Sequence, residues 1–328
     1  NHILESAICM EGDEYNSFNE VIINSALNTA INKKGPVHIN VPFSEPLYDT
    51  IDELSIAVNN EPAIYQDLKI EKDLSPFVEK WNQSKKKLIL VGVLNPNTLE
   101  NEYLDVLAKD ESVIVLTEST SNLHHENLFS SIDQLIAPFS EKDFIEFQPD
   151  ILLTFGGMVV SKKIKALLRN YSPKEHWHID SKKAFDTYFC LEHHFKVSPN
   201  LFFKKFIPEI VPLKSDYSNI WLAVNTNRKH KHLEYINNIP FSDFKVFSSI
   251  VKYLPNNTQL QLSNSATIRY AQLFEFDKSV DIFCNRGTSG IDGCTSTAIG
   301  AAVVSKKETI FITGDLSFLY DSNALWNN

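Results

Sequence analysis

The chain has 328 residues, 43% of them hydrophobic and 22% charged, which is ordinary for a globular protein of about two domains. Its formal net charge of −10 argues against nucleic acid or an anionic membrane as a partner, because both attract basic proteins. No apolar run approaches the ~20 residues of a membrane span, and four scattered cysteines predict reduced thiols in a cytoplasmic protein.

The first 50 residues predict one helix and one strand. Apolar residues recur with a 3.6-residue period over residues 18–31, Gly35 ends the helix, and residues 37–41 are typical of a strand. One helix and one strand cannot bury a core, so we expect this segment to belong to a larger domain. Residues 51–66 are polar and without periodicity, which predicts a linker.

Residues 67–214 predict a central doubly wound α/β domain. Strands expected at 88–91, 113–116, 151–155 and 176–179 alternate with helices, including those at 98–108 and 162–168. Such alternation implies a parallel sheet with right-handed crossovers. Gly156 and Gly157 follow a strand, but a third glycine and an acidic partner are missing, so we do not interpret them as a dinucleotide turn.

Residues 215–328 predict a further α/β region with a glycine-rich turn. Strands are expected at 259–262, 281–284 and 309–313, the last buried on both faces. Gly287, Gly290 and Gly293 allow the backbone to adopt positive φ and to point its N–H groups at a ligand, as in a phosphate cradle. The small residues at 294–304 predict a slim helix whose N-terminus is offered to an anion.

Asp315 follows the strand at 309–313. A carboxylate at the carboxyl end of a parallel strand lies where open α/β sheets bind ligands, and Mg²⁺ takes one or two carboxylates together with phosphate oxygens. The alternative is that Asp315 caps the next helix. The glycine turn upstream favours a diphosphate–metal site.

Two arginines are predicted to reach one crevice. Ser265 stands at a helix start with Arg269 one turn later on the same face, and Arg286 directly follows the strand at 281–284. The planar fork of arginine matches a carboxylate bidentately, so this pattern predicts an acidic substrate. Structural salt bridging by both arginines remains the alternative.

Three stretches of sequence resemble the MenD family, the thiamine-diphosphate-dependent synthases of menaquinone biosynthesis. They are Asn-Arg-Gly-Thr-Ser-Gly-Ile-Asp-Gly at 285–293, Gly-Asp-Leu-Ser-Phe-Leu-Tyr-Asp at 314–321, and Gly-Pro-Val-His-Ile-Asn-Val-Pro-Phe-Ser-Glu-Pro-Leu-Tyr at 35–48. The resemblance runs over nearly the whole chain. Since the family extends beyond both ends, we expect the chain to be an internal fragment.

The resemblance implies the doubly wound α/β domains of the thiamine-diphosphate-dependent superfamily. Residues 1–50 would be the C-terminal tail of the pyrimidine-binding domain, 67–214 the central domain, and 215–328 the N-terminal part of the diphosphate-binding domain. The glutamate that activates the cofactor would lie outside the chain, so we expect no catalytic residue within it and no activity from it alone. Asn327 and Asn328 follow Asp315 too closely to complete the family's metal motif.

The family decarboxylates 2-oxoglutarate on thiamine diphosphate, held with Mg²⁺ or Mn²⁺, and adds the succinyl carbanion equivalent to isochorismate. The product is 2-succinyl-5-enolpyruvyl-6-hydroxy-3-cyclohexene-1-carboxylate. By resemblance, the substrate-binding residues are Ser265, Arg269, Arg286 and Lys162, the cofactor-binding residues are Ser289, Gly290, Ile291, Gly314 and Asp315, and Asp315 also binds the metal.

Two of these assignments have a purely structural alternative. By resemblance, Ile291 occupies the place of the apolar wedge that bends the cofactor, and the alternative is that it anchors the turn to the core. By resemblance, Lys162 occupies the place of a substrate-contacting lysine, and the alternative is that it is a solvated member of the basic run at 162–165.

The resemblance also implies a homodimer or homotetramer, because the superfamily builds each active site between two subunits. Two other functions remain open. The chain could belong to another thiamine-diphosphate-dependent 2-oxo acid decarboxylase or carboligase, since the turn and the Gly-Asp pair recur across that superfamily. It could also be a non-catalytic ligand-sensing or assembly module built on the central domain.

Overall fold

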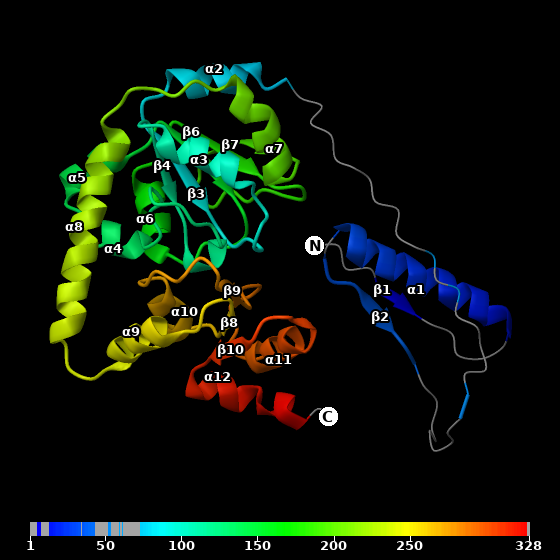
Figure 1. The fold of residues 1–328 in the computed structure, drawn as a ribbon. Helices are drawn as coiled ribbons and strands as arrows, with labels where there is room; N and C mark the ends of the chain where they lie inside the picture. The colour runs from blue at the N-terminus through cyan, green and yellow to red at the C-terminus, as the bar shows by residue number, and fades with distance from the viewer. Residues whose placement is uncertain are drawn as a thin grey trace. The chain divides into compact units, whose positions relative to one another are not determined.

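The computed structural model describes residues 5–7, 13–33, 35–42, 52–53, 59, 61 and 73–326 (Figure 1). The chain divides into two compact units, Asn1–Lys69 and Ile70–Asn328. Within the described ranges, none of the helices combines the length and the apolar character needed to cross a lipid bilayer.

The first unit contains one helix and a two-stranded sheet. The strand β1 (Glu5–Ala7), which we had not predicted, pairs in parallel with β2 (His38–Asn40), and α1 (Asp13–Lys33) lies between them in sequence. The buried Asn24 side chain bonds the backbone of residues 59 and 61, at 3.0 Å each. Phe18 and Val21, from the predicted apolar stripe, are 50% and 64% exposed. The predicted linker at 51–66 lies largely outside the described residues.

The second unit begins with a five-stranded parallel sheet in the order β4-β3-β5-β6-β7. The strands are β3 (Lys87–Val91), β4 (Val113–Leu116), β5 (Ile151–Phe155), β6 (Glu175–Ile179) and β7 (Leu191–Phe195). The chain winds from β3 outward to β4 and then from β5 outward to β7, so the predicted doubly wound α/β class is confirmed. The strand β7, which contains His193 and His194, was not among the predicted strands.

Helices cover both faces of this sheet (Figure 1). They are α2 (Ser75–Gln83), α3 (Asn101–Lys109), α4 (Ile132–Ile136), α5 (Glu141–Phe147), α6 (Lys162–Asn170) and α7 (Pro199–Phe206), with 3₁₀ turns η1 (Ser119–Ser121) and η2 (Ile207–Glu209). One core contains Trp81 of α2 and Phe202 of α7, and the other contains Leu135 of α4 and Ile164 of α6. Strands β3, β4 and β5 between them are wholly buried, because a doubly wound sheet has helices on each side.

Glycines allow two strand ends of this sheet to approach closely. A Cβ on Gly92 would lie 1.9 Å from the carbonyl oxygen of Gly157, and Gly156 has φ +81°. Gly157 N–H donates to the carbonyl of Val93 at 2.7 Å. Close packing of β3 against β5 therefore accounts for the Gly156-Gly157 pair.

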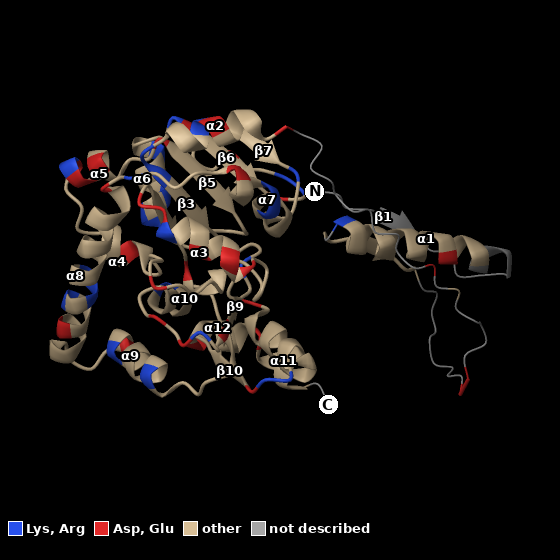
Figure 2. Ribbon diagram, turned by 45° about the horizontal axis from the view of Figure 1, so that its top comes forward, with Lys and Arg blue, Asp and Glu red and all other residues tan. Residues whose placement is uncertain are grey.

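The helix α8 (Tyr217–Asn238) contributes to two cores. Tyr217 and Trp221 at its start pack with the central sheet, and Ile236 near its end packs with the last sheet. It carries both basic and acidic residues (Figure 2). The predicted division at 214/215 falls just before this shared helix and, like the other domain boundaries, stays a prediction.

The last sheet is parallel, three-stranded and ordered β10-β8-β9. Its elements are α9 (Asp243–Tyr253), β8 (Gln259–Leu262), α10 (Ala266–Ala271), β9 (Asp281–Cys284), α11 (Cys294–Val304), β10 (Thr309–Ile312), α12 (Asp315–Tyr320) and η3 (Ser322–Trp326). The expectation that β10 is buried on both faces is wrong, because it is an edge strand and every residue is only half-buried.

Candidate active site

The segments predicted to bind the cofactor and those that carry the two arginines all follow strands of the last sheet, at the same edge of that sheet. Strands β8, β9 and β10 are parallel and in register, with Leu262 paired to both Cys284 and Ile312. Their carboxyl ends therefore coincide, which is the edge where open α/β sheets bind ligands. The segments that follow are Ser263-Asn264-Ser265, Asn285-Arg286 and Gly314-Asp315.

Asn264 connects these segments, and sequence reasoning had missed it. Its side chain is 1% exposed. Its Nδ2 donates to the carbonyls of Asn285 and Gly290, both at 2.7 Å, and its Oδ1 accepts from Arg286 Nη1 at 2.8 Å. One amide thus holds two points of the glycine turn and orients the arginine. The only signal in the sequence was a polar residue directly after a buried strand.

Ser265 and Arg269 lie on α10 as predicted, with Ser265 at the N-cap. Both side chains are exposed. Ser265 has φ +69° and ψ −127°, a conformation that costs a residue other than glycine about 1–3 kcal/mol and that clusters at functional sites. The surrounding hydrogen bonds of Asn264 hold the backbone in this conformation.

Of the three glycines predicted to allow positive φ, only Gly293 adopts it, and Ser289 is the other residue of the turn that does. Ser289 and Gly293 have φ of +63° and +70°, and a Cβ on Gly290 would lie 2.7 Å from Asp292 Oδ1. The carbonyl of Ile291 accepts a hydrogen bond from Ser317 Oγ at 2.5 Å, which ties the turn to α12. The Ile291 side chain is half-buried.

The N-terminus of α11 is bound by a carboxylate of the chain itself. Asp321 accepts from the Ser296 amide and from Ser296 Oγ, each at 2.6 Å. We had expected this helix to offer its N-terminus to a ligand anion, and Asp321 takes that place because it stands on the turn after α12, which the sequence does not reveal. These hydrogen bonds lower the pKa of Asp321 against the opposing effect of burial.

The strand-end edge is where the sequence predicts a diphosphate and its metal. Asp315 opens α12 with an exposed carboxylate, and Gly314 N–H donates to Ser263 Oγ at 3.3 Å. Thr295 Oγ1 and Arg286 Nε are buried without a hydrogen-bond partner among the described residues. That part of the chain has no group of three or more metal-ligating side chains. One carboxylate fits a cation that completes its shell with phosphate and water.

Lys162 and Arg269, far apart in sequence, line the same pocket of about 310 Å³. Lys162 is the first residue of α6, at the carboxyl edge of the central sheet, and its side chain is exposed. Two carboxylates, Glu118 and Asp133, also line this pocket. The structure therefore brings together one cation from the central sheet and one from the last sheet.

Arg286 lines a different pocket, of about 750 Å³, at the carboxyl edge of the central sheet. Its Nη2 lies 3.7 Å from Met158 Sδ, and Ser289 Oγ lies 3.6 Å from the same sulfur. Lys165 shares this pocket, and burial lowers the pKa of its ammonium. The prediction that Arg269 and Arg286 reach one crevice is therefore wrong: the two arginines line different pockets, because they follow different strands of the last sheet. Arg286 is joined to the Ser265 segment through Asn264.

Glu118 is a second residue that sequence reasoning had missed. It follows β4, and its carboxylate accepts from the amides of Val160 and Ser161 at 2.7–2.9 Å. Burial raises the pKa of Glu118 to about 7, while these amides and Lys165 act in the opposite direction. No motif marks it, because its neighbours come from a distant loop.

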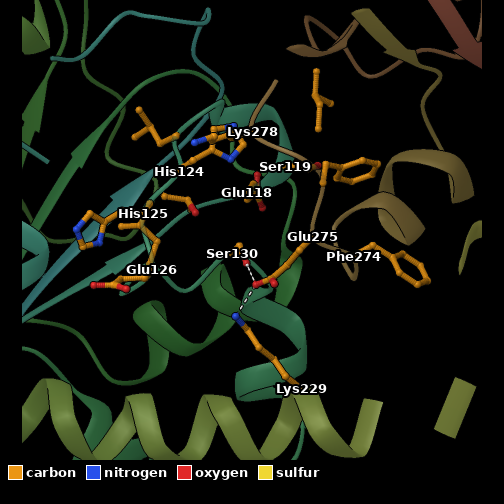
Figure 3. Close-up of a pocket in the computed structure, with 15 residues that line it drawn as sticks. Glu118, Ser119, His124, His125, Glu126, Ser130, Lys229, Phe274, Glu275 and Lys278 are labelled. Carbon is orange, nitrogen blue, oxygen red and sulfur yellow. Dashed lines mark hydrogen bonds and ion pairs between the residues drawn. The ribbon is translucent and has the colours of Figure 1, made fainter. Parts of the chain in front are cut away.

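A third pocket, of about 390 Å³, is also lined by Glu118 (Figure 3). Glu275 accepts from Ser130 Oγ at 2.9 Å and pairs with Lys229 at 2.5 Å. His124 and His125 also line it, and His125 Nε2 lies 3.3 Å from Asp105.

Comparison with known proteins gives a consistent assignment. A family model described as the middle domain of thiamine pyrophosphate enzymes matches residues 59–262. Proteins named 2-succinyl-5-enolpyruvyl-6-hydroxy-3-cyclohexene-1-carboxylate synthase from Flavobacterium psychrophilum and Flavobacterium johnsoniae are 53% and 54% identical, over 100% and 94% of the chain. The protein of that name from Christiangramia forsetii is 54% identical over 96%.

The chain spans 59% of the length of the first of these relatives and 56% of the other two. The family model covers well over half of the chain, including all five strands of the central sheet. The resemblance that the glycine turn and the Gly-Asp segment indicated is confirmed at the level of the family. The chain belongs to the thiamine pyrophosphate enzymes that carry this middle domain.

Proposed function

We propose that the full-length protein is an enzyme of menaquinone biosynthesis, a transferase that decarboxylates 2-oxoglutarate and joins its succinyl group to isochorismate. The product is 2-succinyl-5-enolpyruvyl-6-hydroxy-3-cyclohexene-1-carboxylate. The observation that carries the proposal is the convergence of Lys162 and Arg269 on one pocket, beside strand ends that also hold Arg286. Relatives that are 53% and 54% identical bear the name of this activity.

The substrates account for the number of cations. Each of the two substrates carries two carboxylates, and a carboxylate is bound best by a guanidinium fork or an ammonium. Arg269, Arg286 and Lys162 supply these groups, and Ser265 supplies a hydroxyl at the start of the helix that carries Arg269. The strained backbone of Ser265 keeps that hydroxyl at the open edge of the sheet.

The cofactor of the proposed reaction is thiamine diphosphate, held with Mg²⁺ or Mn²⁺. When bound, it supplies the electron sink for decarboxylation. Ser289 and Gly290 would hold it in the turn, Ile291 would wedge against it, Gly314 would approach its diphosphate, and Asp315 would bind the metal. Asp315→Ala in the full-length protein should abolish cofactor retention in calorimetry, and undiminished binding would remove Asp315 from the site.

We propose further that the protein works in the cytoplasm as a homodimer or homotetramer. Large apolar side chains of α11 and η3 are open to solvent, among them Val303 at 79%, Val304 at 81% and Trp326 at 80%. A partner subunit or the remainder of the diphosphate-binding domain would cover such a surface. The activating glutamate would come from the pyrimidine-binding domain, so the chain by itself would be inactive. A monomer in light scattering of the full-length protein would refute the oligomer.

The experiment that tests the activity is an assay of the full-length protein with a panel of 2-oxo acids, with and without isochorismate. We expect 2-oxoglutarate to be preferred and the succinyl adduct to form. Preference for pyruvate would instead assign the chain to another decarboxylase or carboligase. Ligand binding without turnover of any 2-oxo acid would favour a sensing module.

The arginines give the sharper test. Lysine keeps the charge but loses the fork, and a charge-assisted hydrogen bond contributes about 1.5–3 kcal/mol. Arg269→Lys and Arg286→Lys should therefore lower kcat/KM by roughly tenfold to a hundredfold with unchanged cofactor affinity. Arg228→Lys on α8 is the control and should keep wild-type kinetics. A lower melting temperature with unchanged kcat/KM in either test variant would show a structural salt bridge.

A further inference from the structure

The corner after β4, residues 118–122, contacts three elements, two of which carry a proposed substrate-binding cation and the third of which, β9, ends two residues before one. Its first contact is with the start of α6. Glu118 Oε1 accepts from the Val160 and Ser161 amides at 2.9 and 2.8 Å, and its Oε2 accepts from Val160 at 2.7 Å. Ser161 is the N-cap of α6, and Lys162 is the next residue. The carboxylate thus fixes the backbone directly before Lys162, in the orientation that a helix N-terminus favours.

The second contact is made by the adjacent residue, Ser119. Its amide donates to Gln272 Oε1 at 2.9 Å, and its hydroxyl accepts from Gln272 Nε2 at 2.8 Å. Gln272 is the C-cap of α10 and lies three residues after Arg269. Its side chain is 8% exposed, so both bonds are shielded from water. The end of the helix that carries Arg269 is therefore fixed to the central sheet.

The third contact is made by Asn122, which has φ +50° and closes η1. Its Oδ1 accepts from Ile282 N at 2.8 Å, and its Nδ2 donates to the carbonyls of Ile282 and Leu94, both at 2.9 Å. The side chain therefore pairs with β9 as a neighbouring strand would. Arg286 lies four residues further on, after β9 ends.

We infer that Glu118, Ser119 and Asn122 form a brace that sets Lys162, Arg269 and Arg286 at the spacing the substrates require. The brace residues are positioning residues that act through the three cations. The inference rests on the proposed function, because it assumes that these cations bind substrate. Its physical basis is that three residues of one corner of the central domain make hydrogen bonds to segments more than 40 and 150 residues away.

The first measurement is a double-mutant cycle in the full-length enzyme. Glu118→Gln keeps the shape but places an amide N–H₂ against the Val160 N–H, so α6 should shift. Misplacement by about 1 Å can cost a hundredfold, and we expect kcat/KM to fall roughly tenfold to a hundredfold with unchanged affinity for thiamine diphosphate. In a Lys162→Ala background the same change should cost nothing further. Glu126→Gln, an exposed carboxylate of the neighbouring pocket, is the control.

The second measurement follows the backbone instead of turnover. Hydrogen exchange should accelerate at the amides of 160–164 in Glu118→Gln and of 280–284 in Asn122→Asp, and not in the control. If Glu118→Gln lowered kcat/KM by the same factor with Lys162 present and with Lys162 replaced by alanine, the inference would be wrong and Glu118 would have a general structural role. Wild-type kinetics in both variants would overturn it as well. A wild-type enzyme that makes no adduct from 2-oxoglutarate and isochorismate would refute the proposed function itself.

Discussion

The two sheets of the second unit differ in how they bury their apolar residues. The central sheet is covered by helices on both faces, and its strands β3, β4 and β5 are buried at every position. The last sheet leaves its edge strand β10 half-exposed, and α11 presents Val303 and Val304 to solvent. The central sheet thus lies between two cores, whereas the last region places its proposed binding groups on an open edge.

The largest expected effect is on the free energy of unfolding, and it should differ between two tryptophans. Trp177 on β6 is 0% exposed and packs edge-on against Phe77, whereas Trp326 in η3 is 80% exposed. Trp177→Ala should lower the free energy of unfolding by about 3–5 kcal/mol, because it opens a cavity in a packed core. Trp326→Ala should stay within about 0.5 kcal/mol. Urea unfolding of the chain measures both.

The same two tryptophan substitutions sharpen the comparison when they are made in the full-length protein. If a subunit or a further part of the chain covers the last region, Trp326→Ala should become costly there, while the effect of Trp177→Ala stays the same. Equal effects of Trp326→Ala in the two proteins would contradict the proposed cover.

The next effect concerns the buried Glu118 between the two regions. Its pKa is raised to about 7 from 4.5, so the folded state favours the protonated carboxyl. That contribution to stability is complete below pH 4.5 and is lost as pH rises through about 7, at about 1.4 kcal/mol per pH unit. Two charged groups face Glu118: Lys165 lowers the pKa of Glu118, and Asp133 raises it. Tyr188 is also close by, and its own pKa is raised chiefly by burial.

The measurement compares wild type with Glu118→Gln over that pH range. The stability of wild type relative to the variant should fall between pH 4.5 and 7 and then level off. Glu126→Gln, at an exposed carboxylate, is the matched control. A constant difference between wild type and Glu118→Gln would contradict the raised pKa.

A smaller effect is expected at the open edge of the last sheet. Asn264→Ala removes three hydrogen bonds and leaves buried groups unpaired, which should cost about 1–3 kcal/mol of unfolding free energy. It should also weaken thiamine diphosphate binding, because the turn loses its anchor. Asn256→Ala, on an exposed loop of the same region, should change neither quantity. Unchanged affinity of Asn264→Ala for thiamine diphosphate would show that the Asn264 side chain does not support the cofactor site.

The smallest effect should have the opposite sign. Glycine adopts positive φ at little cost, so Ser265→Gly should stabilise the protein by about 1 kcal/mol while lowering kcat/KM. Ser305→Gly, at φ −74°, should not stabilise. Thermal unfolding and substrate kinetics check the two parts. A loss of stability in Ser265→Gly would show that the conformation is unstrained.

Much of the central domain could be predicted because its strands are short apolar runs with helices between them. Ile151–Phe155 was predicted with its observed bounds. The strand β7 was missed because His193 and His194 interrupt its apolar pattern, and pairing with β6 decides its conformation. The burial of β10 was wrong because periodicity reports an apolar strand but not its place at the edge of a sheet.

For the site, local sequence determined the glycine turn, the helix start at Ser265 and the strand-end aspartate, since each depends on φ preferences and on neighbours within a few residues. Only the tertiary structure decided which distant groups meet. It brings Lys162 to Arg269, it fills the N-terminus of α11 with Asp321, and it buries Glu118 against α6. These contacts depend on how separate elements pack, and the free energy of that packing has no signature in any single stretch of sequence.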